Sequence, residues 1–168
     1  KSGAYRVDIL PYVVGVGNPF AGEGTQHYER TYYAHRGIGA NQDSYVCPAK
    51  TANKRCPICE YRAKLAKDPN ADEDMIKDLA PKERQLFNVI NLNEPDKGVQ
   101  IWDISFHLFG KLLDGRIRNQ DDDDKFERFC ELEGGLTLKL EVEDKTMGSF
   151  KFCNVSAIDF KPRRQDYD

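Results

Sequence analysis

Three cysteines and one histidine lie within 25 residues of each other, in a chain that has five cysteines in all. They are His35, Cys47, Cys56 and Cys59, and only two residues separate the last pair, so one tight turn can present both sulfurs to the same ion. Thiolates and imidazole are the ligands that Zn²⁺ accepts in a tetrahedral site. The stretch around them has little apolar content of its own. The spacing therefore predicts a structural Zn²⁺ centre with these four residues as ligands.

The histidine ligand is less firmly fixed by the sequence than the thiolates. His27 and His107 are the other two histidines, and they compete with His35 for this role. Cys130 and Cys153 stand in apolar patterns and are predicted to be core thiols. An odd number of cysteines, with three at metal-like spacing, favours a reducing compartment over a disulfide framework.

The composition predicts a soluble globular protein with one sizeable core. The chain has 168 residues, of which 39% are hydrophobic and 32% charged, and no apolar run approaches the length of a membrane span. We therefore expect no membrane partner. The net charge of -3 is unevenly spread: residues 1–67 carry ten Lys and Arg against five Asp and Glu, whereas residues 68–168 carry fifteen against twenty-three. This distribution indicates a polyanion-binding surface around the cysteines, and an uneven solvated surface is the alternative.

The chain pattern predicts a mainly β fold. Strands are expected at residues 4–16 with a break at Pro11, and at 27–36, 85–93, 99–105, 136–142 and 150–160. Helices are expected at residues 57–65, 71–79 and 106–113. Five or more strands joined by Gly-rich turns predict a small antiparallel barrel with short helices. We expect one domain, residues 1–168, with a zinc-binding insertion at residues 35–82.

One enzymatic alternative uses the same cysteines. The His-Tyr-Glu segment at residues 27–29, followed by the cysteine pair at 56–59, resembles the signature of zinc nucleobase deaminases. That signature has Pro before the first cysteine, where this chain has Arg55, and it leaves Cys47 without a role. A site closed by four protein ligands has no open position for a reactive water. We therefore predict that the chain is not an enzyme.

The order of a strand, His-x11-Cys-x8-Cys-x2-Cys, a helix and further strands resembles the T-even phage helix-destabilising protein family. These are single-stranded DNA-binding proteins of the replication fork. The specific part of the resemblance covers residues 27–60, and the rest matches only in strand order. The resemblance implies an OB-fold core whose inserted zinc subdomain uses His35, Cys47, Cys56 and Cys59 as ligands.

It also implies a setting: DNA replication, recombination and repair in the cytoplasm of a phage-infected bacterium. Replication or recombination proteins would be further partners, through segments that this sequence does not contain. A zinc-ribbon module that binds proteins in a replication or transcription assembly is the alternative.

Binding of single-stranded DNA without sequence preference needs cations for the phosphates and aromatic faces for the unstacked bases. Strand alternation predicts that Tyr28, Arg30, Tyr32 and Arg36 share one face. The alternative is that the aromatic residues pack in the core, and the basic cluster at residues 161–164 is assigned to an exit linker. The predicted DNA-contacting residues are Tyr28, Arg30, Tyr32, Tyr33, Arg36, Lys50, Lys54, Arg55, Tyr61, Arg62, Trp102, Phe106 and Lys111.

Overall fold

Buried and exposed residues alternate along the strands that form the centre of the molecule. In β6 (Lys82–Asn91), Gln85, Phe87 and Val89 are buried, and in β8 (Leu136–Met147), Leu138 and Leu140 are buried. Because successive side chains of a strand point to opposite faces, each strand offers one apolar face to a common core. The computed structural model describes residues 1–148 and 150–168, and it confirms the prediction of a mainly β, antiparallel fold.

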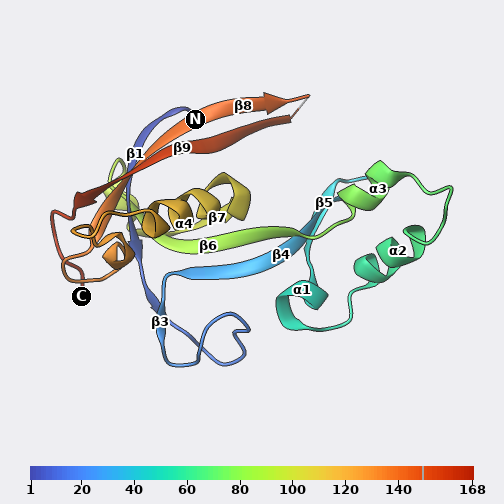
Figure 1. The fold of residues 1–168 in the computed structure, drawn as a ribbon, viewed down its shortest axis with the longest axis horizontal. Coiled ribbons are helices and arrows are strands. Elements are labelled where there is room, and N and C mark those ends of the chain that lie inside the picture. Colours follow the sequence, from blue (N-terminus) through green and yellow to red (C-terminus); the bar gives the residue numbers. More distant parts are fainter. Residues whose placement is uncertain (149) are drawn as a thin grey trace.

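The main sheet has seven strands and is centred on β6 (Figure 1). Strand β6 pairs with β7 along one edge, and with β4 and then β1 along the other. Strand β1 pairs in turn with β8, and β8 with β9. The other strands of this sheet are β1 (Gly3–Leu10), β4 (Glu29–Ile38), β5 (Asp43–Val46), β7 (Val99–Ser105) and β9 (Phe150–Pro162). A separate ribbon joins β2 (Tyr12–Val13) to β3 (Gln26–His27).

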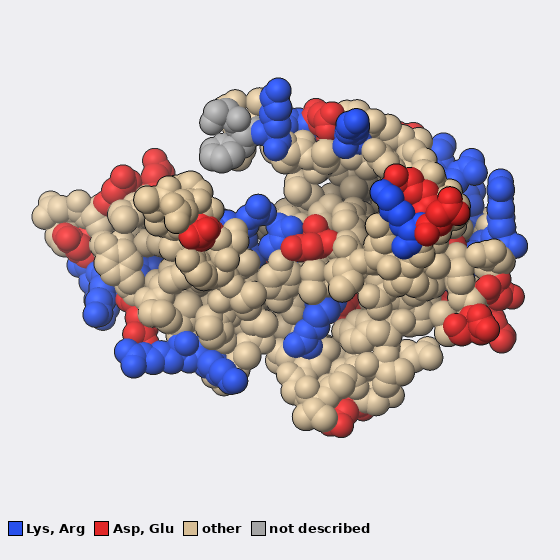
Figure 2. Space-filling model, turned by 180° about the vertical axis from the view of Figure 1, so that it is seen from behind, with Lys and Arg blue, Asp and Glu red and all other residues tan. Residues whose placement is uncertain are grey.

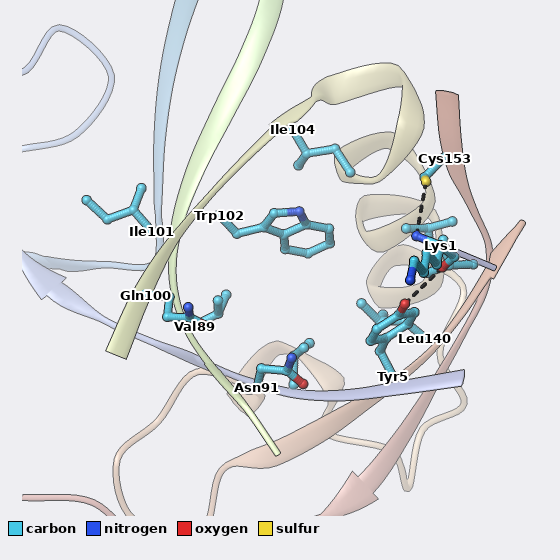
Figure 3. Close-up of a pocket in the computed structure, with 13 residues that line it drawn as sticks. Lys1, Tyr5, Val89, Asn91, Gln100, Ile101, Trp102, Ile104, Leu140 and Cys153 are labelled. Carbon is cyan, nitrogen blue, oxygen red and sulfur yellow. Dashed lines mark hydrogen bonds between the residues drawn. The ribbon is translucent and has the colours of Figure 1, made fainter. Parts of the chain in front are cut away.

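The sheet does not close into the predicted barrel. Closure would require β7 to pair with β9, and no such pairing exists among the described residues. A hollow of about 390 Å³ separates the two sides instead, with Trp102 and Ile104 of β7 facing Leu140 of β8 and Cys153 of β9 (Figure 3). The sheet is therefore open at the position where a barrel would be sealed.

Helices cover the sheet at one end and extend from it at the other (Figure 1). Helix α4 (Gly110–Arg118) buries Leu113 in a core that includes Phe87, Phe109 and Phe129. Each helix of the described chain is too short or too polar to cross a lipid bilayer. The short 3-10 turns are η1 (Pro95–Lys97), η2 (Phe106–Leu108) and η3 (Phe126–Arg128). Three helices, α1 (Pro48–Ala52), α2 (Pro57–Leu65) and α3 (Glu73–Asp78), form what we call the helical lobe, residues 47–81.

A buried polar cluster lies where α4 meets β4 and β6. Gly110 allows the close approach, since a Cβ there would lie 2.0 Å from Gln85 Oε1. The Gln85 Nε2 amide donates to a Glu29 carboxylate oxygen, while Gln85 Oε1 is buried and lacks a partner among the described residues. Burial, with smaller contributions from Asp114 and Glu83, raises the pKa of Glu29 to about 7. The cluster therefore favours a protonated Glu29, which is able to donate a hydrogen bond.

The raised pKa predicts how stability depends on pH. The folded chain binds an extra proton at Glu29 between pH 4.5 and 7, so the free energy of unfolding falls as pH rises through that window. We expect Glu29→Gln to flatten this part of the profile and to stabilise the protein at pH 8 by on the order of 2 kcal/mol. Urea unfolding across the pH range measures the effect. Glu133→Gln, at an exposed position, is the matched control, and equal profiles for both variants would contradict the prediction.

The end of the chain is fastened to β1 by a buried charge. Asp8 is 1% exposed and accepts hydrogen bonds from Thr137 Oγ1 at 2.6 Å and from the Tyr167 hydroxyl at 2.6 Å. The Arg163 side chain is also buried, with its Nε 3.7 Å from Asp8 Oδ2. Its guanidinium further donates to the backbone carbonyls of Ile9, Phe129 and Glu131. The assignment of Arg163 to an exit linker is wrong, because this side chain is part of the folded core.

Candidate metal centre

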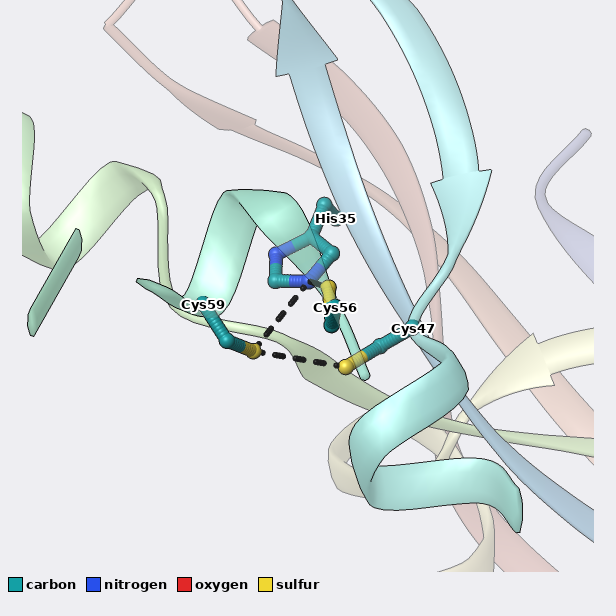
Figure 4. A group of neighbouring side chains, drawn as sticks. All are labelled: His35, Cys47, Cys56 and Cys59. Atoms are coloured by element: carbon teal, nitrogen blue, oxygen red, sulfur yellow. Dashed lines mark hydrogen bonds between the residues drawn. The ribbon is translucent and has the colours of Figure 1, made fainter. Parts of the chain in front are cut away.

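Two separate elements present the four predicted ligands to one point (Figure 4). His35 lies on β4 opposite Tyr45 of β5, and Cys47 directly follows β5 as the N-cap of α1. Cys56 is the N-cap of α2 and Cys59 lies in its first turn. The β4–β5 hairpin thus supplies one histidine and one cysteine, and the start of α2 supplies the other two cysteines.

The distances in this cluster are those of a tetrahedral site. The sulfurs of Cys47 and Cys59 are 3.5 Å apart, and His35 Nε2 lies 3.3 Å from the Cys56 sulfur and 3.6 Å from the Cys59 sulfur. A tetrahedral ion with bonds of about 2.3 Å to sulfur and about 2.0 Å to nitrogen places sulfurs about 3.8 Å apart, and sulfur and nitrogen about 3.5 Å apart. All four ligand atoms lie within 4.8 Å of one another. The cluster is therefore able to hold a metal ion such as zinc.

A hydrogen bond outside the cluster orients the histidine. His35 Nδ1 lies 2.8 Å from the backbone carbonyl of Leu79, the residue that caps the C-terminus of α3. A carbonyl oxygen only accepts, so Nδ1 carries the proton and the Nε2 lone pair points toward the cysteines. Metal-binding histidines usually have such a partner on their second nitrogen. The contact also ties the end of α3 to the site.

Burial makes the cluster unfavourable without a cation. His35 and Cys47 are fully buried and Cys56 is 3% exposed. Burial and the neighbouring sulfurs of Cys47 and Cys56 raise the pKa of the Cys59 thiol to about 12. Three thiolates at this spacing repel one another, and a bound divalent cation reverses the effect on their ionisation. The donor set thus suits a divalent ion that accepts sulfur.

The competing histidines lie elsewhere. His27 packs beside Tyr28 with ring centroids 5.1 Å apart, and its Nε2 lies 3.9 Å from Glu29. His107 is exposed in η2, beside Phe106. Among the described residues, the group able to hold a metal is the His35 cluster, without His27 or Glu29. The deaminase arrangement, with both of these residues at the cysteines, is not assembled.

Most of the predicted strand face lies outside the core, with one exception. Arg30, Tyr32 and Arg36 alternate along β4 on the face opposite Thr31, which is buried. We call this the outer face of the sheet.

The prediction that Tyr28 shares the outer face is wrong, because a bend between β3 and β4 turns this ring inward. The Tyr28 ring lies edge-on to Phe129, with centroids 4.8 Å apart, and is stacked over Phe87 at 6.4 Å. Tyr33 points to the other side of β4 and lies near Phe20, at 6.4 Å between centroids.

Arg84 is a residue of this face that sequence reasoning missed. It pairs in register with Tyr32, and its Nε donates to the Tyr32 hydroxyl at 3.2 Å and to Asp103 at 2.9 Å. Tyr32 donates in turn to Asp103 at 2.8 Å. Only the register between β4 and β6 brings Arg84 beside Tyr32, so no local pattern in the sequence could have identified it.

The predicted residues of the helical lobe divide into exposed and structural ones. Lys50 and Lys54 are exposed, and Tyr61 keeps 49% of its surface in solvent. Arg55 is exposed and forms an ion pair with Glu60, with Nε and Oε1 2.6 Å apart. The Arg62 side chain donates to the backbone carbonyl of Ile76 at 2.9 Å, so it connects α2 to α3.

The remaining predicted residues surround α4. Trp102 is half-buried, with its ring centroid 4.6 Å from that of Phe109, and it borders the hollow shown in Figure 3. Phe106 is half-buried against Gly110, and Lys111 is exposed. These residues and the lobe residues therefore lie on different parts of the molecule.

No protein-family model matches this chain, and no curated protein matches it.

The geometry predicts one tightly held metal ion per chain. We expect Cys59→Ser to lower metal affinity by at least about 100-fold, since even loss of a partner outside the ligand set costs 10–100-fold. Elemental analysis and competition with a chromophoric chelator measure this loss. Cys153→Ser, at an exposed cysteine outside the cluster, is the control and should bind metal normally. A wild-type chain without stoichiometric metal, or equal affinities of the two variants, would contradict the prediction.

Proposed function

We propose that this chain is a non-enzymatic single-stranded DNA-binding protein that contains a structural Zn²⁺ ion. The observation that carries the proposal is the combination of a Cys₃His cluster with cationic and aromatic side chains on the adjoining surfaces. The helical lobe exposes Lys50, Lys54 and Tyr61, and the neighbouring outer face of β4 carries Tyr32 and Arg36. Cations and aromatic rings of this kind are what a flexible, unpaired polynucleotide requires.

Zinc is the metal that suits the donor set best. Three thiolates and one imidazole in a tetrahedron form a closed structural site, and soft sulfur ligands disfavour Mg²⁺ and Ca²⁺. His35, Cys47, Cys56 and Cys59 would hold the ion, and the His35 contact with Leu79 would keep the ring in place. The role of the ion is to fix the lobe against the sheet, since four protein ligands leave no position for substrate.

The sheet supports an open OB-fold as the framework. Strands β1, β6, β7, β8 and β9 are antiparallel, and α4 lies between β7 and β8 in the chain. OB-folds are partly open five-stranded barrels that bind oligonucleotides on the face of strands two and three and with two loops beside it. Here β6 and β7 correspond to those strands, and the helical lobe and the β8–β9 hairpin to the loops. Figure 2 shows the surface hollowed between the lobe and this hairpin, with Lys and Arg side chains in the hollow.

A protein-binding zinc module is the second candidate, and one observation favours it. The edge strand β5 exposes Tyr45 and Val46, at 49% and 56% of their surfaces, beside the metal cluster. An exposed apolar edge strand offers a place for another chain to dock. Such a module would bind zinc without binding oligonucleotides.

A salt titration separates the two functions. We expect the wild-type chain to bind oligo-dT in preference to a duplex of equal length, and log K to fall linearly with log salt concentration. Fluorescence anisotropy from 20 to 300 mM NaCl measures the slope. Absence of salt-dependent binding to oligo-dT would overturn the proposal and leave the protein-binding module.

Substitutions in the lobe test the contact surface. We expect Tyr61→Ala to weaken oligo-dT binding by roughly 5–150-fold, the cost of about one stacked base. Lys54→Gln should instead reduce the salt slope by about 0.7, the value for one phosphate contact on a single strand. Lys125→Gln, at an exposed position outside the lobe and the outer face, is the control for the second variant. Unchanged affinity in Tyr61→Ala would remove the lobe from the binding surface.

Metal removal should affect folding and binding together. Because the ion orders the lobe, we expect chelation to lower the Tm and to weaken oligo-dT binding in the same sample. Differential scanning fluorimetry and anisotropy on one chelator series measure both effects, and added Zn²⁺ should restore them. A metal-free chain with full affinity would show that the ion has no mechanical role in binding.

A further inference from the structure

A second basic region lies on the outer face of the sheet, formed by β1, β8 and the end of β9. It is a hollow of about 350 Å³, lined by four cationic side chains together with Leu92, Thr137 and Pro162. The cations are Arg6, Lys139, Lys161 and Arg164. At the end of the molecule where Figure 1 places the C-terminus, Figure 2 shows Lys and Arg along the upper right margin, with Asp and Glu beside and below them.

Strand register places like charges side by side in this hollow. Arg6 of β1 lies directly opposite Lys139 of β8, and Lys161 of β9 lies opposite Thr137 in the next row. Like charges in directly opposed cross-strand positions destabilise a sheet. Asp159 pairs with Lys139 on its other side, but none of the four cations forms an ion pair with a described carboxylate. The chain has a net charge of -3, so an overall excess of cations does not explain the group.

Buried contacts hold the floor of this hollow in place. Thr137 lines it and donates to the buried Asp8, which also binds Tyr167 and faces Arg163. These contacts hold the end of the chain against β1, and they fix the backbone that carries the neighbouring Arg164. The cationic side chains therefore converge from elements whose relative positions are set by buried contacts.

We propose that this hollow binds phosphate groups of a nucleic-acid backbone. All four charged side chains are hydrogen-bond donors, and none has a side-chain acceptor in the part of the chain that the structure describes. The ligand that they fit is therefore an oxyanion. The arginines suit a planar two-point contact with phosphate oxygens, and the lysines act as point charges.

A polynucleotide is favoured over an acidic peptide because the hollow continues the outer face that carries the proposed DNA contacts. The backbone N–H of Leu92, the residue directly after β6, donates to the Arg6 carbonyl of β1. The outer face of β1 is therefore continuous with the outer face of β6. The inference rests on the proposed function and lengthens its contact surface beyond the lobe. The backbone phosphates would then offset the repulsion between Arg6 and Lys139.

Charge reversal at Arg6 tests this idea in a way that separates binding from folding. Arg6→Glu places an acid opposite Lys139, so we expect the Tm to rise by about 1–3 °C. The same variant should lose phosphate binding: millimolar pyrophosphate should raise the Tm of the wild type at constant ionic strength, and leave that of the variant unchanged. A lower Tm in Arg6→Glu would show that the residue is merely structural. A wild-type Tm unmoved by pyrophosphate would overturn the site.

Oligonucleotide length then distinguishes this inference from the proposed function. The double variant Lys139→Gln/Lys161→Gln should reduce the salt slope for a 20-mer oligo-dT by about 1.4, and leave the slope for a 6-mer unchanged. Arg118→Gln/Lys125→Gln, at exposed positions outside the lobe and this hollow, is the control of equal charge. If the wild type binds oligo-dT and Lys139→Gln/Lys161→Gln keeps the wild-type salt slope at both lengths, only this inference fails. If the wild type binds neither oligonucleotide, the proposed function fails with it. Polyglutamate and polyphosphate of equal charge are then compared as competitors of oligo-dT. If polyglutamate competes equally well, the hollow is a site for acidic peptides and the proposal is overturned.

Discussion

The helical lobe has no apolar core, and this makes the Cys₃His cluster the constraint on which the architecture depends. Between residues 47 and 81, all of which the structure describes, only Cys47 and Cys56 are buried, and α1, α2 and α3 bury none of their residues. Ordering a backbone costs about 1–2 kcal/mol per residue, and burial of apolar surface normally offsets that cost. Here the cluster must supply much of the stabilisation. It joins the β4–β5 hairpin to α2 directly, and the His35 contact with Leu79 brings in the end of α3.

In the sheet, β6 sets the positions of the helical lobe and of the β8–β9 hairpin. One edge of β6 is shared by β4, which leads to the lobe, and β1, which leads to the β8–β9 hairpin. The lobe and the hairpin therefore lie at fixed positions along the same strand, and the surface is hollowed between them (Figure 2). A lobe ordered around the Cys₃His cluster and a hairpin ordered by the sheet are both needed to define the hollow between them. Under the proposed function, loss of metal would remove one of its walls and leave the core of the sheet intact.

Sequence reasoning succeeded where short-range patterns decide the structure. The predicted strand at residues 99–105 and the predicted helix at 57–65 match β7 and α2, and the cysteine spacing identified residues that the structure brings together. It failed where long-range register decides. A bend after β3 turns Tyr28 into the core, and the sheet stays open because β7 and β9 do not meet. The Arg6–Lys139 pair and the buried Arg163 depend on contacts across more than 100 residues of chain, which no local pattern encodes.

Two regions conflict with ordinary stability rules and also have a clear ligand chemistry. A lobe without a core and a sheet row with opposed cations both lower the stability of the isolated chain. Natural sequences generally agree with their fold at every level, and the exceptions concentrate at functional sites. Under the two proposals, a bound cation would resolve the first conflict and a bound anion the second. Both proposals follow from the same physical argument, in which a ligand supplies the interaction energy that the polypeptide lacks at that position.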